Sequence, residues 1–237
     1  CASAIVRWSP ARSHFERQQL LTALGGWSAS VDLDETLRRA LRDEQVECRW
    51  AAAESYARVF AANPSAASYL LGVSKSNVRP EVRAAALHAL VQVSAWIGAA
   101  SEAAEWNIGS HALELQLTCI AARVRTVRHT SDDLDKLLRI LSTDSLDYAL
   151  QQQLNRLICD GWQRDATLRS KCLHFIRQER GTLESDFPLE YLVSSYPNDS
   201  EIAGVIAGLI DRDELHLGFR SERIWTLLRA GYAGHKP

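Results

Sequence analysis

An internal repeat of about 34 residues is the feature that most limits what this chain can fold into. Cys48 and Ala52 align with Val82 and Ala86, within segments that share the order polar cap, aliphatic residue, Arg and small residue. Weaker copies follow, and the aliphatic residue recurs at five positions: Cys48, Val82, Leu115, Leu168 and Ile202. The longer step from Leu115 to Leu168 leaves room for two extra helices. Such a period is typical of helix pairs that stack in chain order and bury their apolar faces against one another.

Amphipathic helix spacing accompanies the repeat along most of the chain. Leu33, Leu37 and Leu41 recur four residues apart opposite a charged face, and alternating strand patterns are nearly absent. We therefore predict an all-α fold, a right-handed α-solenoid of stacked antiparallel helix pairs with about a dozen helices. Residues 1–30 show no repeat and are predicted to form a non-repeat helix or a connection to a missing upstream region, whereas residues 31–237 form the solenoid.

Several helix starts are marked by capping residues. Asp32, three residues before Glu35, predicts a capping box. Asn63 followed by Pro64 supplies a cap and a first-turn proline, and Pro80 suits the same first-turn position. These signals divide the chain into helices with short connections.

Two segments carry a resemblance to a known family. Residues 41–59 read LRDEQVECRWAAAESYARV and residues 76–93 read SNVRPEVRAAALHALVQV, and both resemble HEAT repeats of the short bacterial kind. The likeness is good over residues 33–95 and diffuse to residue 230. It implies a non-enzymatic protein-interaction scaffold or sensor, such as the C-terminal recognition segment of a bacterial NACHT-type NTPase, and it transfers no catalytic residues.

Composition limits the cellular location of the protein and the classes of ligand that it is expected to bind. The 27 basic and 29 acidic residues give a net charge of -2, which argues against a dedicated binder of nucleic acid or anionic membranes. Five widely spaced cysteines favour reduced thiols and a cytoplasmic protein. The chain begins at Cys1 and has no Met, which predicts a piece of a longer protein, with a lipid-bearing Cys1 as the alternative. The longest uncharged apolar run, Ile202 to Ile210, is too short to span a membrane.

No residue set predicts catalysis, a metal or a cofactor. Phosphate-cradling and dinucleotide-binding glycine motifs are absent from the sequence. Cys172 and His174 lie two positions apart on a helix and point in different directions, so a buried thiol and a surface imidazole are expected. His111 and Cys119 are too few for tetrahedral zinc.

A protein partner is predicted to bind the concave face, which the second helix of each pair supplies. The candidate contact residues are the basic and aromatic side chains Arg123, Arg125, Arg128, Trp27 and Trp106. The alternative is a HEAT-like DNA-binding enzyme resembling the alkylpurine DNA glycosylases, with a groove that three other residues would line: Trp162, Arg164 and Arg169. The sequence leaves the oligomeric state open.

Overall fold

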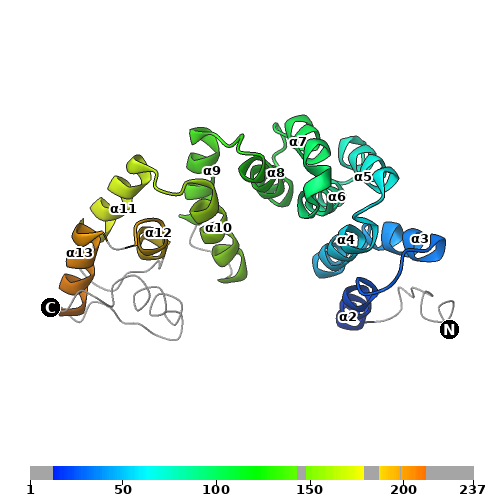
Figure 1. The fold of residues 1–237 in the computed structure, drawn as a ribbon, viewed down its shortest axis with the longest axis horizontal. Helices are drawn as coiled ribbons and strands as arrows, with labels where there is room; N and C mark the ends of the chain where they lie inside the picture. The colour runs from blue at the N-terminus through cyan, green and yellow to red at the C-terminus, as the bar shows by residue number, and fades with distance from the viewer. Residues whose placement is uncertain (1–12, 143–147, 179–186, 198, 212–237) are drawn as a thin grey trace. The chain divides into compact units, whose positions relative to one another are not determined.

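The computed structural model describes residues 13–142, 148–178, 187–197 and 199–211 (Figure 1). Within these ranges the chain forms twelve α-helices and one short 3-10 helix, and no strand, as the sequence predicts. The helices are α2 His14–Leu24, α3 Val31–Ala40, α4 Val46–Phe60, α5 Pro64–Lys75, α6 Pro80–Gln92, η1 Ser94–Trp96, α7 Ile97–Trp106, α8 Leu113–Arg125, α9 Ser131–Leu141, α10 Tyr148–Gly161, α11 Ala166–Gln178, α12 Phe187–Ser195 and α13 Ser200–Asp211.

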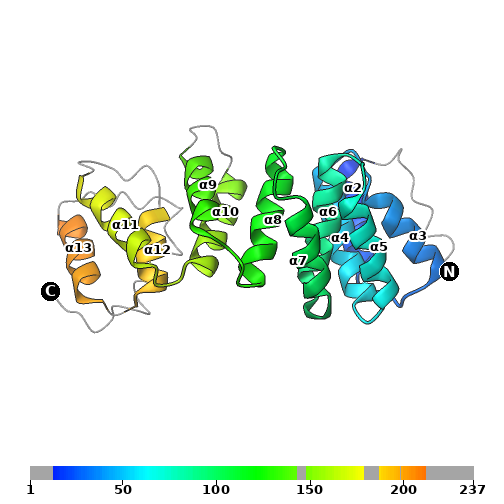
Figure 2. The same ribbon diagram turned by 90° about the horizontal axis from the view of Figure 1, so that it is seen from above.

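The chain divides into two compact units, residues 1–129 and 130–237. In the first unit α2, α4, α6 and α8 contact one another in that order, and α3, α5 and α7 pack against them from one side (Figures 1 and 2). The pairs α3–α4, α5–α6 and α7–α8 are therefore stacked repeats of an α-solenoid. In the second unit α9 contacts α10, α11 contacts α12, and α10 contacts α12.

The repeat positions read from the sequence are buried in both units. All five aliphatic positions are at most 3% exposed, namely Cys48, Val82, Leu115, Leu168 and Ile202. The first three lie on α4, α6 and α8, the second helix of each pair, whereas Leu168 lies on α11, the first helix of its pair. Between Leu115 and Leu168 the pattern therefore moves from the second helix of a pair to the first. An aliphatic residue followed by a small one is typical of any closely packed helix face, so it can occur in either helix of a pair.

Helix α2 lies within residues 1–30 and is fixed to α4. The Ser55 hydroxyl donates to the Leu21 carbonyl at 2.7 Å, and the Cys48 thiol donates to the His14 carbonyl at 3.4 Å. Gly25 permits this approach, since a Cβ there would lie 2.9 Å from the Ser55 Oγ. The boundary at residue 30 stays a prediction.

The helix caps are partly as predicted. Asn63 accepts a hydrogen bond from the Ser65 amide, and Pro64 and Pro80 occupy the first turns of α5 and α6. Asp32 was the wrong residue for α3, because Ser30 caps that helix and accepts from the Leu33 amide. Both residues have a suitable side chain, and the helix starts two positions earlier than the Asp32 capping box would require.

Candidate functional site

In the first unit, α4, α6 and α8 keep exposed or half-buried side chains at four-residue spacing. We call this surface the even-helix face and define it by Trp50, Glu54, Arg58, His88, Gln92, Ala121 and Arg125. Glu54, His88 and Ala121 occupy the same position of successive repeats, so consecutive helices present their side chains side by side. The face is thus a continuous row of comparable sites with different chemistry.

An aromatic and polar cluster lies on the even-helix face. The rings of Trp50 and His88 meet edge to face, with centroids 4.1 Å apart and planes at 79°. The His88 Nε2 lies 3.8 Å from a Glu54 carboxylate oxygen and 3.2 Å from the Gln92 amide nitrogen. The neighbouring His88 imidazole is the main reason why the pKa of Glu54 is lowered from its usual range. The cluster joins two repeats and combines a large apolar ring with polar atoms that face solvent.

A buried polar layer lies at the amino-terminal ends of the same helices. The Arg49 guanidinium donates to the carbonyls of Asp43 and Glu44 at 3.1 and 2.9 Å and to the Glu114 carboxylate at 3.1 Å. Burial raises the pKa of Glu114, and the charge of Arg49 opposes that rise. Arg83 at the matching position donates to the buried Asn107 side chain at 3.0 Å. These contacts stabilise the fold that presents the even-helix face.

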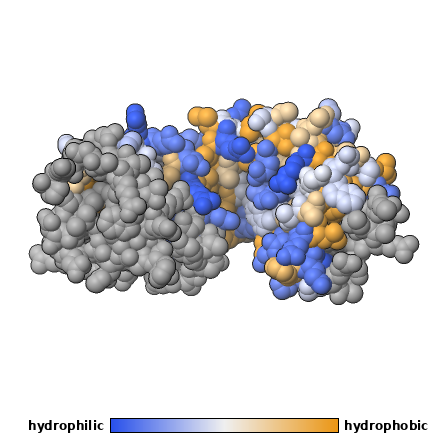
Figure 3. All heavy atoms as spheres, turned by 60° about the horizontal axis from the view of Figure 1, so that its bottom comes forward, coloured by the Kyte–Doolittle hydropathy of each residue, from blue (hydrophilic) through white to orange (hydrophobic). Residues whose placement is uncertain are grey.

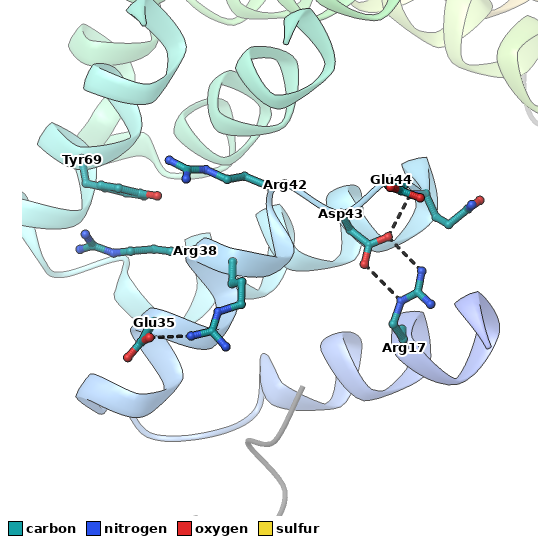
Figure 4. Close-up of a pocket in the computed structure, with 9 residues that line it drawn as sticks. Arg17, Glu35, Arg38, Arg42, Asp43, Glu44 and Tyr69 are labelled. Atoms are coloured by element: carbon teal, nitrogen blue, oxygen red, sulfur yellow. Dashed lines mark hydrogen bonds and ion pairs between the residues drawn. The ribbon is translucent and has the colours of Figure 1, made fainter. Parts of the chain in front are cut away.

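A separate open pocket of about 850 Å³ lies between α3, α5 and the turn after α3 (Figure 4). We call it the arginine pocket, and its lining residues are Arg17, Glu35, Arg38, Arg39, Arg42, Asp43, Glu44, Gln45 and Tyr69. Arg17 forms an ion pair with Asp43 at 3.0 Å, and Arg39 one with Glu35 at 2.6 Å. The pocket is therefore lined mainly by charged residues, and two ion pairs already compensate part of their charge.

The basic residues proposed from the sequence make contacts within the protein. Arg123 is buried, Arg125 donates to the Val91 carbonyl at 2.6 Å, and Arg128 pairs with Glu105 at 2.6 Å. The Arg125 side chain ties α8 to the end of α6, and Arg128 forms an exposed ion pair. Whether these arginines bind a partner stays a prediction.

The two proposed tryptophans are exposed but lie at different places. Trp106 ends α7, is 62% exposed, and has the Lys75 ammonium 5.1 Å from its ring centroid. Trp27 follows α2 and is 38% exposed. The structure places Trp50 half-buried beside His88. The repeat offset of 34 aligns Glu54 with His88, so it could have found the contact of His88 with Glu54 but not the contact with Trp50.

The residues proposed for a DNA groove have structural contacts in the second unit. Arg169 pairs with Asp199 at 2.9 Å and with Glu201 at 2.7 Å. Trp162 is buried, and its carbonyl accepts a hydrogen bond from Tyr191. Arg164 is exposed and has a left-handed backbone, with φ of 57°. Two carboxylates around Arg169 reduce the positive charge that it could offer to phosphate groups.

The cysteine and histidine residues behave as expected where they can be seen. Cys172 is buried, which raises its pKa to about 12, and His174 is exposed. The four cysteines in the described ranges are free thiols. Across the same ranges no group of three or more His, Cys, Asp or Glu side chains could hold a metal ion.

Length and hydropathy give no single membrane-spanning helix in the described part of the chain. Residues 80–92 and 94–106 reach the necessary length and apolar character only together, and they are bent by 118° where they join.

Stacked helix pairs with a mixed polar and aromatic face define an α-helical repeat scaffold. Residues 14–91 match the sequence model of a family described as HEAT repeats, which together with the helix pairs supports a HEAT-like repeat protein. A solved structure described as an engineered protein of the Northeast Structural Genomics Consortium aligns over 88% of this chain and 96% of its own, with 14% identity and a TM-score of 0.36. No curated protein matches this chain.

Proposed function

We propose that this chain is a non-enzymatic protein-interaction scaffold that binds a protein partner through the even-helix face. The observation that carries the proposal is the cluster of Trp50, Glu54 and His88, which lies across two repeats. Tryptophan is enriched among the residues that dominate protein interfaces, because its large ring buries much area with few torsions to order.

The charge pattern favours a protein over a polyanion. Glu54 lies among the exposed side chains of the even-helix face and Arg58 lies one turn further along α4, so both signs of charge are present. Figure 3 shows that, on the face turned to the viewer, the coloured residues are a mixture of hydrophilic and hydrophobic ones. Such a mixture is typical of the rim and core of a protein interface, whereas a phosphate-binding groove requires an excess of basic side chains.

The test is a comparison of two tryptophan variants. The partner is first captured on the immobilised chain, and its dissociation constant is then measured for the parent and for Trp50→Ala and Trp106→Ala. We expect Trp50→Ala to weaken binding at least tenfold, as for an interface residue that contributes more than about 1.4 kcal/mol. Trp106→Ala is the matched control. Loss of affinity with Trp106→Ala alone would place the interface at the end of α7 and overturn the proposal.

The alternative class has its own measurement. Duplex DNA is titrated at two salt concentrations, because a protein that tracks phosphates loses affinity steeply as salt rises. We expect no specific binding. A steep salt dependence that Arg169→Gln reduces would favour the DNA-binding enzyme.

A finer proposal concerns the setting of the scaffold. The resemblance to bacterial HEAT-like repeats supports a place as the recognition segment of a cytoplasmic NACHT-like NTPase. The residues encoded before Cys1 test this, since a Walker-type loop is expected there. A lipobox in its place would move the protein to a cell envelope.

The predicted basic contact residues can be tested on the same partner. Reversing Arg125 and Arg128 to Glu is expected to slow association, because charges near an interface act mainly on the encounter rate. An unchanged association rate would remove both arginines from the binding surface.

A further inference from the structure

The arginine pocket lies on α3, α5 and the turn between α3 and α4, away from the residues of the even-helix face. Arg38, one of the arginines that line the pocket, is held in place by neighbouring side chains. The buried Tyr56 hydroxyl donates to Asp34 at 2.9 Å, and the second Asp34 oxygen lies 2.8 Å from the Arg38 Nε. The Arg38 guanidinium also lies 3.8 Å from the centre of the Tyr69 ring. Arg38 therefore enters the pocket with its orientation fixed at both ends.

A second arginine in the pocket is uncompensated. Arg42 is exposed, and among the described residues no carboxylate forms an ion pair with it. In Figure 4 its guanidinium extends toward Tyr69, on the same side of the pocket as Arg38. Arg79 adds a third guanidinium nearby, because its terminal nitrogen donates to the Arg42 carbonyl at 3.2 Å. Positive charge thus exceeds negative charge at this end of the pocket.

The opposite end of the pocket carries acidic groups. Asp43 is paired with Arg17, whereas the exposed Glu44 has no ion-pair partner among the described residues. A carboxylate that lines the same pocket as the arginines repels every phosphate of a polyanion that passes it, whereas a single carboxylate bound at the arginine end meets this repulsion only once. An isolated carboxylate on a polypeptide fits this arrangement better than a nucleic acid does.

We propose that the arginine pocket is a second binding site, which takes an acidic side chain of a partner polypeptide between Arg42 and Arg38. Arginine presents paired N–H donors that match the two oxygens of a carboxylate, and Tyr69 supplies the flat surface beside it. The site does not depend on the even-helix face, and its occupant is a peptide segment with Glu or Asp flanked by neutral or basic residues.

The test uses a peptide with one Glu among Gly residues, labelled with a neutral fluorophore and titrated by anisotropy against the full chain at low and physiological salt. Arg42→Gln is expected to weaken binding about threefold or more, within the range measured for single ion pairs with good geometry. Arg58→Gln is the matched control, since it removes the same charge from an exposed arginine of the even-helix face. Equal effects of the two variants would reduce the binding to net charge and overturn the site.

Two more variants separate the contribution of the Tyr69 ring to peptide binding from the contribution of the arginine charges. Tyr69→Leu removes the ring against which Arg38 packs and is expected to weaken the peptide, whereas Tyr69→Phe keeps the ring and should bind as the parent does. Circular dichroism of each variant establishes that it is folded. If Tyr69→Leu is folded and binds as the parent does, the proposed geometry is wrong.

The remaining arms of the experiment test the chemistry of the occupant and the place where it binds. A Lys-Gly peptide of equal length should not bind, and duplex DNA should not compete with the acidic peptide. Competition by DNA that Arg42→Gln abolishes would make the pocket a phosphate site instead. Trp50→Ala should leave peptide binding unchanged, so a loss there would assign the probe to the even-helix face and overturn the proposal without affecting the function proposed for that face.

Discussion

The two units of this chain obtain their packing in different ways. In the first unit, neighbouring repeats meet through small residues, and Ala52, Ala53, Ala85 and Ala86 are fully buried on α4 and α6. In the second unit the buried apolar side chains are larger, such as Leu154, Ile158 and Ile176, and polar side chains also join the helices. The Tyr191 hydroxyl donates to the Trp162 carbonyl at 2.8 Å. The family match covers residues 14–91 and lies wholly in the first unit.

The difference teaches which repeats a sequence pattern can find. Alanine packing needs a particular residue at a particular place in every helix, because any larger side chain would hold the neighbouring helix away. Hydrogen bonds between helices need only two groups within reach, which many sequences supply. A pattern search therefore gives a clear repeat where alanines set the distance between helices, as in α4 and α6, and a weaker one where larger side chains fill the space, as around Leu168 and Ile202.

The strongest test of this comparison is to place a larger side chain among the buried alanines of α4 and α6. Ala86→Leu should cost about 1 to 3 kcal/mol of unfolding free energy, because Ala86 is fully buried and the added carbons have no free volume. Ala23→Leu, at an exposed position of α2, is the control and should change little. Chemical denaturation measures both, and equal stability of Ala86→Leu and the parent would show that the repeat positions are assigned wrongly.

The second prediction tests the buried ion pair of the first unit. Arg49→Gln should cost about 2 kcal/mol at neutral pH, because it leaves the Glu114 carboxylate poorly compensated. The pKa of Glu114 is already raised by burial, and loss of Arg49 raises it further. Since the folded state then holds its proton to higher pH than the unfolded state does, stability falls as pH rises past the unfolded value of about 4.3.

The pH dependence supplies the control for Arg49→Gln. Its deficit relative to the parent should be smallest near about pH 4, where Glu114 is protonated in the unfolded chain, and should grow toward neutral pH. In a Glu114→Gln background the deficit should lose this dependence. A deficit that stays constant with pH in both backgrounds would mean that Glu114 is not the group responsible.

The third prediction removes one hydroxyl from the second unit. Tyr191→Phe should cost about 1 kcal/mol, because the Tyr191 oxygen donates to the Trp162 carbonyl and accepts from the Asp165 amide at 3.1 Å. Tyr69→Phe is the matched change in the first unit and should be close to neutral. A neutral Tyr191→Phe would show that polar contacts do not hold these helices.

The smallest effect is expected at an exposed ion pair. Arg128→Gln removes the pair with Glu105, both of whose side chains are more than half exposed, and should change stability by less than about 1 kcal/mol. Raising the salt concentration should reduce the difference further. A loss of stability as large as that of Arg49→Gln would mean that the contribution of an ion pair to stability does not depend on its exposure in this fold.

The sequence predicted the helix class and the buried register because these depend on local spacing. Val82 and Ala86 are identified by their separation alone, and Asn63 followed by Pro64 marks a helix start without any distant partner. Ser30 displaced Asp32 as a cap because neighbouring capping residues compete within one turn.

The candidate sites were harder to predict because they depend on contacts between separate helices. His88 is unremarkable until α4 brings Trp50 against it. Arg38 joins Tyr69 across 31 positions of sequence, and nothing in the composition of either segment indicates that meeting. Arg123 looked like a surface charge in the sequence, yet it is buried in the fold.

The contact between Arg49 and Glu114 has a consequence for the order in which the first unit folds. Most helix contacts there join neighbours in the stack and can form as soon as two adjacent helices exist. This pair spans 65 residues, from α4 to α8, and forms only after three successive pairs have docked. Formation of this ion pair therefore shows that all three helix pairs have docked. Mutational analysis of the folding kinetics should find that Arg49 has not yet formed this contact in the transition state, whereas Val82 is already packed.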